Sequence, residues 1–133
     1  MSEPNSSAEE HAKRQLNSIV RLINALRKAE KSDNEDAIEK ARQAIEEAPI
    51  SAETRSGWHS PGTKDEEDVE YLILLSTGGP ASRVYGELGE GNEPSTAAIQ
   101  YQDWGTPWTT LRPLFEKQKK ALLEYARCFY WGN

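Results

Sequence analysis

The hydrophobic pattern of this chain changes period twice, and these changes limit the folds available to it. Before Pro49, apolar residues recur every three or four positions, which is the spacing of one face of a helix. Between Pro49 and Trp108 they alternate or run together, as they do in strands. After Thr109 the helical spacing returns. The pattern predicts an α+β fold, with an N-terminal helical hairpin, a three- to four-stranded antiparallel β-meander and a C-terminal helix packed on the sheet.

The domain boundaries follow from the same pattern. A length of 133 residues fits one domain. Residues 1–8 are polar and are expected to form a disordered tail. The single domain is expected over 9–133, with helices at 9–49, the β-meander at 50–108 and the C-terminal helix at 109–131.

The N-terminal segment reads as two amphipathic helices with a break near Ser32. The apolar stripe of the first helix comprises Leu16, Ile19, Val20, Ile23 and Leu26. Ser32 and Glu35 have the spacing of a capping box, and Pro49 ends the second helix. The pair is expected to cover the sheet. A coiled-coil arm that joins two copies is the alternative, so a homodimer through these helices is also predicted.

The middle segment contains the most apolar run of the chain, Tyr71–Leu75. A continuous run of this length is typical of a strand buried on both faces, so Leu72, Ile73 and Leu74 are all expected to be buried. The segment before it, from Ser51, is expected to be a short edge strand.

Two further segments alternate in polarity. In the first, Arg83, Tyr85 and Glu87 share the face opposite the apolar positions. In the second, Ile99 and Tyr101 are expected on the core side. Short turns join these strands, and this predicts the antiparallel meander.

Charge is distributed unevenly along the chain. The whole protein has a net charge of −6, and residues 51–100 alone hold three basic and nine acidic side chains. This acidic balance argues against nucleic-acid binding, which needs clustered lysine and arginine. It fits a basic protein partner or a surface that imitates DNA. No apolar run is long enough to span a membrane, the N-terminus lacks a secretion signal, and one cysteine favours a reducing setting, so a cytoplasmic protein is expected.

Few residues suggest chemistry. The two histidines, His11 and His59, and the single Cys128 have no metal-ligand spacing, so no metal site is expected. Cys128 lies among aromatic residues near a helix end, which favours an unreactive thiol over a nucleophile paired with His59. The segment STGGPAS lacks the lysine of a phosphate-binding loop and reads as a hairpin turn. No catalytic residue and no cofactor are predicted.

The segment YQDWGTPW joins the last long strand to the C-terminal helix. Asp103 is expected to cap its turn by accepting backbone hydrogen bonds. Trp104 falls on the face of the polar strand residues, so it is the expected exposed anchor for a partner. Trp108 is the expected plug beneath the C-terminal helix. A purely structural corner that uses both indoles is the alternative.

A resemblance to a known family rests on the runs RSGWHSPG, LLSTGGPASRVYGELGEGNEPSTAAIQYQDWGTPWTTL and LLEYARCFYWG. These segments resemble small uncharacterised proteins encoded by bacteriophages and integrated mobile elements. The match covers about residues 55–132, and no catalytic assignment comes with it. The resemblance implies a phage accessory protein in a bacterial cytoplasm, similar to anti-CRISPR or anti-restriction inhibitors.

Two classes of function remain open at this point, with a third behind them. The first is a non-enzymatic binder that inhibits a host defence or nucleic-acid-processing protein. Its candidate partner-binding residues are Trp58, Arg83, Tyr85, Glu87, Asp103 and Trp104. The second is a small enzyme or ligand-binding domain with a cleft formed by His59, Tyr101 and Asp103. The third is a virion structural protein that assembles through its N-terminal helices.

Overall fold

A computed structural model describes residues 6–56, 68–77, 80–103 and 105–132. Helices α1 (Ser6–Ser32) and α2 (Glu35–Glu47) form the hairpin. Strands β1 (Ser51–Ser56), β2 (Asp68–Ser76), β3 (Ala81–Glu87), β4 (Ala98–Gln102) and β5 (Thr109–Thr110) follow, with a short 3-10 turn (Glu90–Asn92) before β4. Helix α3 (Glu116–Arg127) follows β5. The α+β class and the order of its parts are confirmed.

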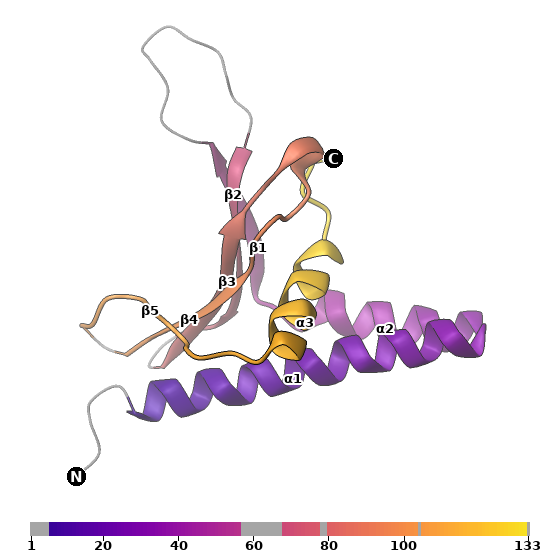
Figure 1. Ribbon diagram of the computed structural model, residues 1–133, viewed down its shortest axis with the longest axis horizontal. Helices are drawn as coiled ribbons and strands as arrows, with labels where there is room; N and C mark the ends of the chain where they lie inside the picture. The colour runs from indigo at the N-terminus through magenta and orange to yellow at the C-terminus, as the bar shows by residue number, and fades with distance from the viewer. Residues whose placement is uncertain (1–5, 57–67, 78–79, 104, 133) are drawn as a thin grey trace, which may run out of the picture.

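The sheet is an antiparallel meander in the order β1-β2-β3-β4-β5. Its helices lie to one side: α1 crosses the strands and contacts β3 and β4, α3 packs on α1 and β4, and α2 runs back along α1 (Figure 1). One face of the sheet is therefore covered by helices, and we call the other the open face.

The hydrophobic core lies between the covered face and the helices. Tyr71, Ile73, Val84 and Ile99 are almost fully buried there. From the helix side the core receives the α1 stripe and the buried face of α3, namely Leu16, Ile19, Ile23, Leu122, Tyr125 and Ala126. The predicted alternation of β3 and β4 is confirmed.

Tyr71 shows how tightly this core is built. Its hydroxyl donates a hydrogen bond to the carbonyl oxygen of Thr96 at 2.6 Å, and its ring packs on Trp131 with centroids 5.0 Å apart. The hydroxyl passes directly over Gly86, where an added Cβ would lie 2.1 Å from the Thr96 oxygen. Position 86 therefore has no room for a side chain, and glycine is required there.

Several boundaries differ from the predicted ones. Helix α1 begins at Ser6 and buries Ala8, so the predicted tail of residues 1–8 is too long. Asn34, rather than Ser32, caps α2: its side chain accepts the N–H of Ala37 at 3.2 Å, while the Ser32 hydroxyl bonds back to Ala29. Asn34 serves as the N-cap because its extended backbone sets the side chain beside the first helical N–H groups.

The C-terminal helix starts later than predicted. Residues 109–110 form β5, and α3 begins at Glu116, because Pro113 disfavours helix at the residue before it. Gln118 accepts the N–H of Phe115 at 2.8 Å and so closes the first turn. Phe115 precedes the helix and is 78% exposed, so its ring takes no part in the buried face of α3.

The prediction that β2 is buried on both faces is wrong. Ile73 is buried, whereas Leu72 and Leu74 are only half-buried. They point to the open face, on the side of the sheet away from the three helices.

Candidate functional site

The open face of the sheet presents a compact group of polar and aromatic side chains. Because strand residues alternate between faces, the register brings matching positions of neighbouring strands together. Leu74 pairs with Arg83, Arg83 with Gln100, and Gln100 with Thr110, which makes one row across the sheet. Tyr85 lies in the next row, beside Leu72.

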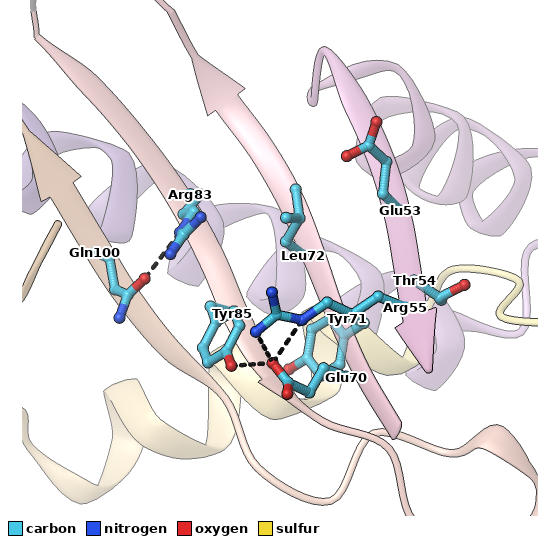
Figure 2. Close-up of a pocket in the computed structure, with 9 residues that line it drawn as sticks. All are labelled: Glu53, Thr54, Arg55, Glu70, Tyr71, Leu72, Arg83, Tyr85 and Gln100. Atoms are coloured by element: carbon cyan, nitrogen blue, oxygen red, sulfur yellow. Dashed lines mark hydrogen bonds and ion pairs between the residues drawn. The ribbon is translucent and has the colours of Figure 1, made fainter. Parts of the chain in front are cut away.

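A hollow of about 320 Å³ opens on this face (Figure 2). It is lined by Glu53, Thr54, Arg55, Glu70, Tyr71, Leu72, Arg83, Tyr85 and Gln100. The volume is at the lower end of the range for small-molecule pockets. The lining holds two arginines and two glutamates, so its formal charges balance.

One side of the hollow is a closed hydrogen-bonded cluster. Arg55 reaches Glu70 with two nitrogens, at 3.1 and 2.7 Å, and the Tyr85 hydroxyl donates to the same carboxylate oxygen. Figure 2 shows both side chains converging on Glu70. The bonds from Tyr85 and Arg55 lower the pKa of Glu70, and the bond to Glu70 raises the pKa of Tyr85. Arg55 is thus already neutralised by an acid.

Arg83 is held differently. Its Nε donates to Gln100 Oε1 at 2.8 Å, and Gln100 in turn donates to Thr110 at 3.3 Å. Its guanidinium carbon lies 4.2 Å from the Trp108 ring centroid and 5.2 Å from that of Tyr85. Burial lowers the pKa of this half-buried guanidinium. Within the described part of the chain, Arg83 forms no ion pair with a carboxylate.

The structure brings together some of the predicted partner-binding residues. Arg83 and Tyr85 both line the hollow. Glu87 is exposed at the end of β3, opposite Glu70 in the register, and lies outside the hollow lining. Trp58 and Trp104 lie outside the described residues, as does His59.

Asp103 lies in the turn after β4. Its backbone N–H donates to the Thr106 hydroxyl at 3.1 Å, and that hydroxyl and the Thr106 N–H both donate to the Asp103 carbonyl. Much of the turn is therefore held by the Thr106 side chain, and capping by the Asp103 carboxylate stays a prediction. Tyr101 is buried on the covered face, so it does not line a cleft on the open face.

The prediction for Trp108 is wrong. The indole was expected beneath the C-terminal helix, but it lies against Arg83 on the open face and is half-buried. The reason is the short strand β5, which carries the chain along β4 and delays the helix.

Arg55, Glu70 and Gln100 were not predicted as site residues. Their polarity alternates with the core positions, which places them on the open face. Their meeting depends on cross-strand register, and the sequence pattern alone does not set that register.

A second polar cluster lies where α1 meets the ends of β2 and β3. His11 on α1 is bonded to Ser76 at 2.9 Å, and Ser76 to the fully buried Ser82 at 2.9 Å. A bulge between Leu74 and Ser76 turns Ser76 toward α1. Burial first, and then the charge of Arg14, lowers the pKa of His11. The Ser76 hydroxyl is thus the sheet-side partner of a neutral imidazole, and Ser82 holds that hydroxyl in place.

Cys128 is half-buried, its thiol donates to the Glu124 carbonyl at 3.2 Å, and burial raises its pKa. Such a thiol has little thiolate character. Over the described residues, no three histidine, cysteine or acidic side chains gather as metal ligands would. Each helix of the described chain falls short of the length or apolar character needed to cross a bilayer.

Comparison of the chain with family models, with curated proteins and with solved structures found no match. The resemblance to phage-encoded proteins therefore stays a prediction from the sequence.

Proposed function

We propose that this protein is a non-enzymatic binding protein that docks a partner protein on the open face of its sheet. The observation that carries the proposal is Arg83. This guanidinium is partly removed from water, fixed by Gln100 and flanked by Trp108 and Tyr85, yet it pairs with no carboxylate in the described chain.

A cation in that state favours an acidic side chain from a partner. Arginine has five N–H donors in a planar fork, and Gln100 takes the donor at Nε. The remaining donors suit a carboxylate, which can bind two of them at once. The partial burial of Arg83 strengthens such a pair, because some of its water has already been lost.

The surroundings of Arg83 suit an interface. Tryptophan, tyrosine and arginine dominate the binding energy of protein interfaces, and here all three types are in contact. The side chains are held before binding by Gln100, Glu70 and the sheet, so little side-chain entropy remains to be lost. The half-buried Leu72 and Leu74 supply apolar area beside them.

The kind of partner is suggested by the sequence. The resemblance to phage accessory proteins points to a bacterial host protein, and we propose a protein of a CRISPR-type or restriction defence, or one that processes nucleic acid. The net charge of −6 supports binding to the protein in place of its nucleic acid. Inhibition would then follow in the bacterial cytoplasm, because the bound host protein could no longer bind its nucleic acid.

The experiment begins with capture of a host partner and continues with purified components. Arg83→Ala should weaken binding by about 30-fold, the effect of a hot-spot residue worth roughly 2 kcal/mol. Arg21→Ala removes the same charge from the exposed side of α1 and should leave affinity unchanged. Arg83→Glu should regain affinity for a partner whose contacting acid is changed to arginine. Equal affinity of Arg83→Ala and the unchanged protein, with equal thermal melts, would refute the proposal.

Self-association through the N-terminal helices remains a separate prediction. Light scattering of the purified protein over a range of concentrations measures it directly. A monomer at all concentrations would remove the homodimer and, with it, the virion-assembly alternative that depends on these helices.

A further inference from the structure

A second candidate binding surface lies between the outer edge of β4 and helix α3. A groove of about 620 Å³ opens there, and it is mainly apolar. Its lining includes Ala97, Leu111, Arg112, Leu114, Lys119 and Leu123. It shares no lining residue with the hollow around Arg83.

The groove exists because the β4–β5 ladder stops early. Tyr101 pairs with Thr109 and Gln100 with Thr110, and the Leu111 N–H donates to the Ile99 carbonyl at 2.9 Å. The same register, continued by two residues, sets position 113 opposite Ala97. That residue is Pro113, which has no N–H to donate, and the chain instead crosses to the start of α3 (Figure 1).

The backbone of Ala97 is consequently left at an open edge. Ala97 directly precedes β4, and with the alternation of the strand continued by this one residue, its N–H and C=O point the same way as those of Ile99, toward the missing partner. Within the described chain, neither group of Ala97 forms a hydrogen bond. Its neighbour Thr96 is fixed by the Tyr71 hydroxyl, which holds this edge in place.

The charges of the groove have one sign. Arg112 and Lys119 are both exposed at its margin, and its lining includes no acidic residue. Glu116 lies 3.4 Å from Lys119, but both side chains are mostly in water, where such a pair contributes little. The margin thus offers two cations to a ligand, in a protein that is acidic overall.

We infer that this groove binds an extended, acidic peptide segment of a partner protein as an added strand. One peptide residue exchanges two backbone hydrogen bonds with Ala97, as in other cases of strand addition. Its neighbours place an apolar side chain against Leu111, Leu114 and Leu123 and a carboxylate near Arg112 and Lys119. The inference is independent of the site proposed at Arg83.

Labelled peptides of about six residues, the length of a typical strand, test this directly. The first alternates aspartate with valine or leucine, the second has lysine for aspartate, and the third is the first with N-methylated backbone amides. The acidic peptide should bind with a dissociation constant between about 10 µM and 1 mM, as expected for a short strand with few contacts. The lysine peptide and the N-methylated peptide should each bind at least about tenfold more weakly.

Variants of the protein locate the site. Arg112→Glu and Lys119→Glu should each weaken the acidic peptide several-fold, whereas Lys120→Glu, exposed on the same helix but outside the groove, should change affinity less than about twofold. Binding should also slow hydrogen exchange of the Ala97 amide. Absence of binding at about 1 mM peptide overturns the inference, as does binding that is indifferent to N-methylation or equal for Lys119→Glu and Lys120→Glu.

Discussion

The two faces of the sheet are made by alternate residues of the same strands, yet they meet different demands. On the covered face, Ile73, Val84 and Ile99 have almost no contact with water. On the open face, Leu74, Arg83 and Gln100 occupy the adjoining positions and are half-buried. Stability depends mostly on the first set, because it buries apolar area against helices. The second set remains available for binding, because all three helices lie on the other side of the sheet.

The largest loss of stability is expected from a substitution at Gly86, on the covered face. Gly86→Ala should destabilise the protein by about 3 kcal/mol or more, since its Cβ would overlap the Thr96 carbonyl, which cannot move without breaking its bond to Tyr71. Gly89→Ala is the matched control, because the nearest atom to its Cβ is 3.5 Å away. Urea unfolding of both variants measures the difference. Equal stability of the two would show that the core is looser at Tyr71 than described.

Ile73 and Leu74 are neighbours in β2 that lie on opposite faces, so truncating each one compares the two faces directly. Ile73→Ala should cost about 2–5 kcal/mol, as truncations in a packed core do. Leu74→Ala removes a similar side chain from the open face and should cost about 1 kcal/mol, because Leu74 keeps part of its contact with water in the folded state. Chemical denaturation of the two variants side by side gives both values. Similar losses would mean that something covers the open face of the free protein.

The smallest effect concerns pH and His11, at the edge of the covered face. Burial lowers the pKa of His11 in the folded state below its usual 6.5. Below pH 6.5 the unfolded chain then binds more protons than the folded one, so stability is complete above that pH and declines as the pH falls.

His11→Gln keeps a polar partner for Ser76 but does not titrate, so its unfolding free energy should fall less on acidification than that of the unchanged protein. Denaturation at a series of pH values measures the two slopes. Parallel slopes would show that His11 is as well hydrated as in the unfolded chain.

Much of the fold could be predicted from the sequence because periodicity reports which face of an element is buried. The α1 stripe and the alternation of β3 and β4 are of this kind. Periodicity says less about what lies on the second face of a strand: the run around Leu72 and Leu74 reads as fully buried, and its partial exposure follows from the arrangement of the helices.

The candidate site shows the same limit. Arg83 and Tyr85 were predicted together because they share a strand face. Arg55 and Gln100 reach that face from strands on either side, at positions set by register and by turns. The start of α3 was missed because Thr109 and Thr110 complete a strand whose pairing with β4 is a long-range contact.

The contact between α1 and α3 also determines when, during synthesis, the hydrophobic core can form. Arg27 and Glu124 form an ion pair although 97 positions separate them. During synthesis α1 precedes every element that it packs on, and α3 is made after the others, namely α2, β3 and β4. Until α3 emerges, the part of α1 that packs on α3 stays exposed to water or to chaperones. Folding of this core is thus expected to wait for α3, and a chain truncated before α3 should aggregate or be degraded.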